Sequence, residues 1–205
     1  MTEIQRALSE IHSIRSQVAR GTEFRGYGPA SIALSGLLAF VVAVAQSEWQ
    51  AAHGSIALGN WIAVWTTAAG LSVLLTGIDT FTRARRVHVG FAREMIQSAV
   101  EQFLPTMAVG LLLTVAMMRF APQEGWMLPG LWELIFSLGV FASCRFLPKQ
   151  MFAVGVWYLA AGLWCLAAAS GTRALSPWMM GIPFGVGQFL VAAVLQFGYR
   201  KSLDG

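Results

Sequence analysis

Residues 174–199, ALSPWMMGIPFGVGQFLVAAVLQFGY, contain no Asp, Glu, Lys or Arg. A helix needs about 20 mostly apolar residues to cross a bilayer, so this run is long enough to span one. Four other runs are equally free of charge, at 26–47, 49–78, 102–118 and 150–172. A further run, 125–144, has one carboxylate in its first half, Glu133. The sequence therefore predicts an all-α integral membrane protein with six transmembrane helices arranged in three hairpins.

The composition also favours a membrane protein over a soluble domain. Of the 205 residues, 56% are hydrophobic and 12% are charged, whereas a soluble domain carries roughly 25% charged residues. The polar side chains are too few to coat a globule of this size. The net charge of +4 comes from scattered basic residues, without the basic and aromatic surface of a nucleic-acid-binding protein. We therefore expect the lipid bilayer, and no nucleic acid, as a partner.

The uncharged runs also set the expected domain boundaries. We expect transmembrane helices near 29–47, 59–81, 99–118, 126–144, 151–170 and 177–199. Together they form one transmembrane domain over 28–200. A cytoplasmic segment, 1–27, precedes this domain, and a short cytoplasmic tail, 201–205, follows it.

Basic residues are distributed unevenly over the connections between these spans. All but two of the 14 Lys and Arg residues lie in the two termini and in the second and fourth connections. The exceptions are Arg119 and Arg173. Because Lys and Arg concentrate on the cytoplasmic side, we expect a multi-pass protein of the cytoplasmic (inner) membrane with both termini cytoplasmic. Four tryptophans then fall near the outer boundary, as an aromatic belt would: Trp49, Trp61, Trp126 and Trp178.

Residues 2–20 predict an amphipathic helix on the cytoplasmic side. Ile4, Ile11 and Val18 recur every seven residues and form an apolar stripe along the helix. This stripe is too short for a stable coiled coil by itself. It has three candidate environments: the inner membrane surface, the cytoplasmic face of this protein, and a partner protein or second copy of the chain.

Two further groups of residues are expected to have structural roles. Arg83, Arg85 and Arg86 follow the second span, where they would contact anionic lipid headgroups. Small residues recur on one face of the third and sixth spans, where they would let helix backbones approach one another: Gly110, Gly181 and Gly185. Close by, Pro183 can free backbone carbonyls, which must then find other partners or a water-filled cavity.

The sequence lacks the motifs of common enzymes. The three histidines, His12, His53 and His88, lie outside the predicted spans, so no intramembrane histidine can activate a serine. No zinc-protease, hydrolase or dinucleotide-binding motif is present. Cys144 and Cys165 lack a metal-ligand spacing and are expected to act as small apolar residues. We therefore predict no catalytic residue, no metal site and no cofactor.

Glu133 is the acidic residue that interrupts the fourth span. It follows Trp126 by seven residues, so it should lie about 10 Å inside the outer boundary. An ionised side chain at bilayer depth costs at least about 2.5–3.5 kcal/mol. Pro129, Gly130 and Ser137 share its helical face, which should point into the bundle. Because no Lys or Arg lies at that depth, we expect a neutral carboxylic acid.

Glu133 and Ser137, with Gln188 of the sixth span at a comparable depth, form a candidate ligand- or proton-binding site. A hydrogen bond between Glu133 and Gln188 is part of this hypothesis. Glu101 and Gln102, nearer the cytoplasmic boundary, form a second and weaker polar pair. The alternative is a neutral Glu133 that only bonds to a neighbouring helix or reaches the water at the surface.

Two functions therefore lead at the level of the sequence, and an intramembrane enzyme is a third and weaker alternative. The first is a non-catalytic accessory, sensory or scaffolding protein that acts through helix–helix contacts. In that case residues 2–20 would contact a membrane face, a protein partner or a second copy of the chain. The second is a small transporter or binding protein with a polar pocket around Glu133 and Gln188.

Overall fold

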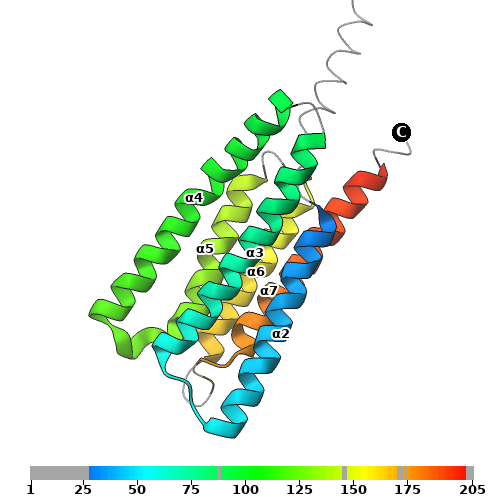
Figure 1. Ribbon diagram of the computed structural model, residues 1–205. Coiled ribbons are helices and arrows are strands. Elements are labelled where there is room, and N and C mark those ends of the chain that lie inside the picture. The colour runs from blue at the N-terminus through cyan, green and yellow to red at the C-terminus, as the bar shows by residue number, and fades with distance from the viewer. Residues whose placement is uncertain (1–27, 87–88, 145–146, 170–172, 174, 202–205) are drawn as a thin grey trace, which may run out of the picture.

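The computed structural model describes residues 28–86, 89–144, 147–169, 173 and 175–201, of which 83–86, 89–100, 102 and 198–201 are described by their backbone alone. This part of the chain is entirely helical, and six of its helices are long and apolar enough to span a membrane (Figure 1). The prediction of an all-α protein with six helices capable of spanning a membrane is confirmed. The predicted amphipathic helix at 2–20 and the tail at 202–205 lie outside the described residues.

The transmembrane helices follow the predicted order. They are α2 (Pro29–His53), α3 (Leu58–Arg86), α4 (Val89–Phe120), α5 (Leu128–Ser143), α6 (Met151–Ala168) and α7 (Trp178–Lys201). A short 3-10 helix, η1 (Pro122–Met127), leads into α5. The largest difference is α4, which begins ten residues before the predicted span because the polar segment ahead of it is also helical. Its apolar part begins only at Phe103.

Local sequence signals explain two of the helix boundaries. Pro29 occupies the first turn of α2, where a residue without a backbone N–H costs no hydrogen bond. At the other end of α2, Gly54 adopts a φ of 87° and its N–H donates to the Gln50 carbonyl at 2.8 Å. This backbone conformation favours glycine and ends the helix.

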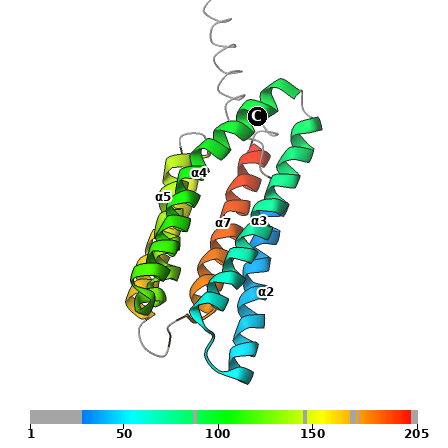
Figure 2. The same ribbon diagram turned by 60° about the vertical axis from the view of Figure 1, so that its left-hand side comes forward.

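The six helices form two layers of three (Figure 2). One layer contains α2, α3 and α7, and the other contains α4, α5 and α6. The closest pairs are α2 with α7 and α5 with α6. Consecutive helices α6 and α7 therefore belong to different layers, and the packing does not establish the predicted grouping into three hairpins. We call the surface where α5 and α6 face α7 the seam.

Glycines allow the close approach within each layer. A Cβ atom on Gly130 of α5 would lie 2.7 Å from the Gly162 carbonyl oxygen of α6, and one on Gly162 would lie 2.8 Å from the Gly130 oxygen. Between α2 and α7, added Cβ atoms on Gly181 and Gly185 would collide with Ala43 and Phe40. By contrast, Gly110 of α4 has no neighbour within 4 Å of such an atom.

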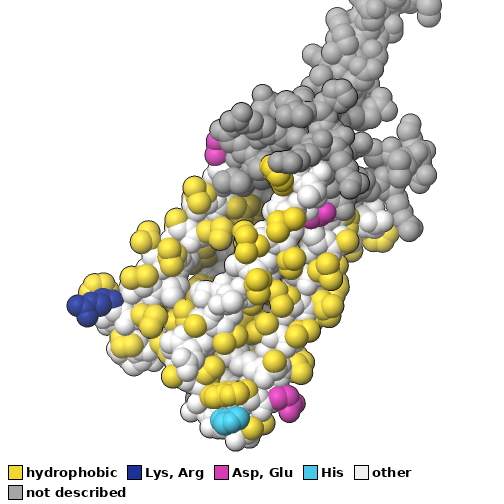
Figure 3. Space-filling view, in the orientation of Figure 1, with side chains coloured by type: hydrophobic (Ala, Val, Ile, Leu, Met, Phe, Trp, Pro, Cys, Tyr) yellow, Lys and Arg dark blue, Asp and Glu magenta, His cyan; other side chains and the backbone are white. Residues whose placement is uncertain are grey.

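The outer surface of the bundle is apolar. Figure 3 shows hydrophobic side chains over the middle of the visible face and charged ones near the helix ends. Helix α4 is the most peripheral, since only 6% of its apolar window is buried against 44% for α7. Leu111, Leu112 and Phe120 of α4 are among its exposed side chains. Such a surface requires an apolar solvent, which is the lipid bilayer.

One predicted aromatic-belt residue lies instead in the core. Trp61 of α3 is completely buried and packs in a cluster with Ala43, Leu128 and Met180. Its ring stacks on that of Trp132 at 5.6 Å between centroids. The prediction for Trp61 is therefore wrong, because the ring fills the contact between the two layers and does not face the lipid headgroups. Trp49 and Trp178 are exposed, as the belt requires.

Candidate functional site

Glu133 is completely buried in the second turn of α5. It lies five residues after Leu128, the first residue of this helix, or about 8 Å along the axis. Pro129, Gly130 and Ser137 on the same face are also buried. The structure thus turns this face into the bundle, as predicted.

The two oxygens of the Glu133 carboxyl group have different surroundings. Oε1 lies 3.7 Å from the Cys165 Sγ atom of α6 and is in hydrogen-bonding geometry with it. Oε2 is buried and has no hydrogen-bond partner. Cys165 is itself fully buried, and its Sγ atom lies 3.4 Å from the Met179 carbonyl oxygen of α7. The carboxyl group therefore sits where α5, α6 and α7 meet.

Proline chemistry explains why the Met179 carbonyl accepts from a thiol. Pro183 lies inside α7 and has no N–H to donate to the carbonyl four residues earlier, which is that of Met179. The helix stays continuous through Pro183, and Cys165 supplies a donor in place of the missing one. In addition, the Trp157 Nε1–H of α6 donates to the Pro183 carbonyl at 3.0 Å. The sequence predicted that a carbonyl freed by Pro183 would need a partner but did not identify Cys165 as its donor.

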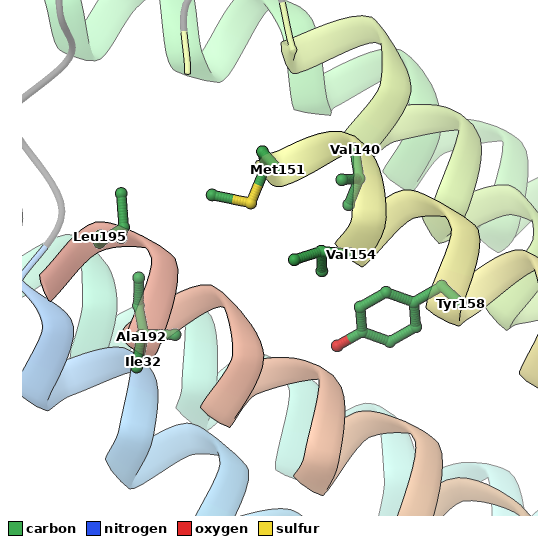
Figure 4. Packing of buried hydrophobic residues seen from close by; sticks show 7 residues of the cluster. All are labelled: Ile32, Val140, Met151, Val154, Tyr158, Ala192 and Leu195. Carbon is green, nitrogen blue, oxygen red and sulfur yellow. The ribbon is translucent and has the colours of Figure 1, made fainter. Parts of the chain in front are cut away.

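Tyr158 is a second buried polar residue at the seam, and sequence reasoning missed it. Its side chain is completely buried, and its hydroxyl has no hydrogen-bond partner. The ring packs edge-on against Phe136 of α5 at 4.7 Å and contacts Phe184 of α7 at 5.3 Å. In Figure 4 the hydroxyl points from α6 toward α7, among the apolar side chains of this cluster. No pattern in the sequence distinguishes this tyrosine from one facing lipid.

The structure does not join Gln188 to Glu133 by a hydrogen bond. Gln188 is partly buried on α7, nine residues beyond Met179, which places it about 13 Å further along the helix. It lies close to the Tyr158 hydroxyl, although the two groups do not reach hydrogen-bonding geometry. The predicted bond between Glu133 and Gln188 is therefore wrong, because the two residues differ in depth. Ser137, one turn from Glu133, donates its hydroxyl hydrogen to the Leu134 carbonyl at 2.7 Å.

The second predicted polar pair is distant from Glu133. The Trp132 Nε1–H of α5 donates to Thr114 Oγ1 of α4 at 2.8 Å, so this part of α4 is level with Glu133. Glu101 lies thirteen residues before Thr114, or about 20 Å away along α4, and its side chain is exposed. The side chain of Gln102 lies outside the described part of the chain. The same holds for the side chains of Arg83, Arg85 and Arg86.

Glu133 is also electrostatically isolated. It is the only Asp, Glu, Lys, Arg or His on α5, α6 and the described side chains of α7. Without a cation beside it, an ionised carboxylate here would lose its hydration with no compensating charge, so the neutral acid is favoured. The described residues contain no group of three His, Cys, Asp or Glu side chains that could hold a metal ion. The chemistry open to this group is therefore the binding and release of a proton or of a hydrogen-bonding ligand.

Comparison with known proteins adds no family to this description. No protein-family model matches the chain, and neither a curated protein nor a solved structure is measurably similar to it.

Proposed function

We propose that this chain is a non-catalytic membrane protein with an accessory or sensory role, and that it binds and releases a proton at Glu133. The observation that carries this proposal is a completely buried carboxyl group with one oxygen lacking any partner. An unsatisfied buried polar group costs about 1–3 kcal/mol. A carboxyl group with an unpartnered oxygen can bind a proton or a hydrogen-bonding ligand without first breaking an existing hydrogen bond.

The proposed setting is the cytoplasmic (inner) membrane, with both termini on the cytoplasmic side. The concentration of Lys and Arg in the termini and in two of the connections supports this orientation. Glu133 would then lie in the outer half of the bundle, nearer to the extracytoplasmic solution than to the cytoplasm.

Infrared spectroscopy of Glu133→Gln tests the proton site. The wild-type protein in lipid vesicles should show a carbonyl band of a protonated carboxyl group at neutral pH, because burial favours the neutral acid. We expect this band to lose intensity as the pH is raised above neutral and to be absent from Glu133→Gln at neutral and alkaline pH, where ordinary carboxyl groups are ionised. Glu101→Gln, which changes an exposed carboxyl group on α4, is the matched control and should keep the band. An unchanged band in Glu133→Gln would refute the proposal.

Transport is the second candidate function. The observation that favours it is the position of Glu133 beside the seam between two three-helix layers, since many transporters place their sites between two structural units. Vesicles that contain a trapped pH-sensitive dye should acidify under a proton gradient with the wild-type protein and should not do so with Glu133→Gln. Equal acidification with both proteins, or with neither, would restrict the role of Glu133 to sensing.

Residues 2–20 lie outside the described residues, and their proposed role rests on their heptad pattern alone. We expect deletion of these residues to change the oligomeric state or the set of co-purifying proteins. The expected result is loss of at least one partner or of a dimer, while the transmembrane domain remains folded. If neither property changes in native membranes, this segment does not act as a contact for proteins.

A further inference from the structure

We propose that Cys165 is a hydrogen-bond switch that couples the protonation of Glu133 to the contact between α6 and α7. This inference rests on the proposed proton site and states what that site controls. Because α6 and α7 belong to different layers, the switch would transmit the state of Glu133 across the seam.

The Cys165 thiol has more hydrogen-bond acceptors nearby than hydrogens to donate. The Cys165 Sγ atom faces two acceptors, the Met179 carbonyl oxygen at 3.4 Å and Glu133 Oε1 at 3.7 Å. A thiol carries one hydrogen, so it can donate to only one of them at a time. The protonation state of Glu133 determines which of these two acceptors receives the thiol hydrogen of Cys165.

When Glu133 is a neutral acid, both contacts can form together. The carboxyl O–H donates to the sulfur, which is a weak acceptor, and the thiol hydrogen donates to the Met179 carbonyl. That carbonyl has no helical donor, because residue 183 is a proline. The result is a continuous chain of hydrogen bonds from α5 through α6 to α7.

When Glu133 is ionised, the chain cannot persist. The proton leaves to water at the membrane surface, and the carboxylate can then only accept hydrogen bonds. Because a hydrogen bond to a charged acceptor is roughly twice as strong as a neutral one, the thiol hydrogen turns to Glu133 Oε1. The Met179 carbonyl then loses its donor, while the hydrogen bond from the Trp157 Nε1–H of α6 to the Pro183 carbonyl of α7 remains.

Few other groups can interfere with this exchange. The titratable side chain in contact with Glu133 is Cys165 of α6, and Tyr158 lies seven residues before it on the same helix, with its hydroxyl directed toward α7. The described side chains of α7 contain none. The titratable residues of α4 and η1 with described side chains are exposed and do not face the site: Glu101, Arg119 and Glu124.

The S–H stretching band of the full-length protein in lipid vesicles tests the switch directly. The second cysteine, Cys144, bonds its own helix at the Val140 carbonyl, so Cys144→Ala leaves Cys165 as the only thiol. In Cys144→Ala we expect the S–H band to shift as the Glu133 carboxyl band disappears with rising pH. Adding Glu133→Gln should hold the S–H band at one position, because the amide does not titrate in this range and can donate to the sulfur.

The outcomes separate the switch from the proton site on which it rests. If the carboxyl band titrates while the S–H band stays fixed, the switch is wrong and the proton site remains. If the S–H band shifts equally with Glu133→Gln present, some other group drives it and the switch is also wrong. If no carboxyl band titrates at all, the proton site itself fails.

Pro183→Ala gives an independent arm of the test. Alanine restores an N–H that can donate to the Met179 carbonyl in a regular helix, so this carbonyl no longer depends on Cys165. In the Cys144→Ala background we expect Pro183→Ala to reduce or abolish the shift of the S–H band with pH. Pro105→Ala, which removes an exposed proline inside α4, is the matched control and should leave the shift intact. An undiminished shift in Pro183→Ala would overturn the role given to the Met179 carbonyl.

Discussion

Glu133→Met should make the protein more stable, by about 1–3 kcal/mol in the free energy of unfolding, which is the usual cost of an unsatisfied buried polar group. Methionine has a similar length, no polar hydrogen and enough flexibility to fill the space of the carboxyl group. Cys165 would retain its contact with the Met179 carbonyl. The measurement is the unfolding free energy in mixed detergent micelles at neutral pH.

Ser137→Ala is the matched control for Glu133→Met. Ser137 is equally buried on the same face of α5, but its hydroxyl is satisfied within the helix, so we expect little change in stability. A gain confined to Glu133→Met, together with the loss of the titrating carboxyl band, would mean that the carboxyl group is kept at the expense of stability. Residues retained in this way are typical of functional sites. A clear loss of stability would show that Glu133 is a structural residue.

The number and order of the membrane spans could be predicted because they depend only on the apolar character of consecutive residues along the chain. Each span must be apolar over its whole length, and a single charge such as Glu133 is visible against that background. The inward direction of the Glu133 face also followed from helical spacing, since Pro129, Gly130 and Ser137 fall on the same side.

The partners of Glu133 could not be predicted, because they depend on which helices pack together. Gln188 was expected to reach Glu133 from its distance to a boundary tryptophan, but the way in which α5 and α7 are offset along their axes separates the two residues in depth. Cys165 was expected to act as a small apolar residue. Its contact with the Met179 carbonyl depends on the packing of α6 beside Pro183, which the sequence does not show. Similarly, Trp61 was expected at the lipid boundary and lies in the core, because stacking across the two layers has no sequence signal.

Gly130→Ala and Gly162→Ala should each destabilise the protein by about 1–3 kcal/mol, the usual cost of overpacking. A new Cβ atom at either position would lie within 2.8 Å of a backbone carbonyl oxygen of the facing helix, which cannot rotate away as a side chain can. Helices α5 and α6 must therefore separate. Because the two sites share one contact, the double variant should cost less than the sum of the single variants.

Gly110→Ala is the control for the two glycine variants, since an added Cβ atom on Gly110 has no neighbour within 4 Å. It should be neutral or stabilise α4 by up to about 1 kcal/mol, the difference in helix propensity between glycine and alanine. Glu133 and Cys165 each lie three residues after one of the contact glycines, so separation of α5 from α6 should also lengthen the distance between the carboxyl group and the sulfur. We therefore expect both contact variants, unlike Gly110→Ala, to weaken the shift of the Cys165 S–H band with pH. Loss of stability without any change in this band would mean that the closeness of α5 and α6 serves folding alone.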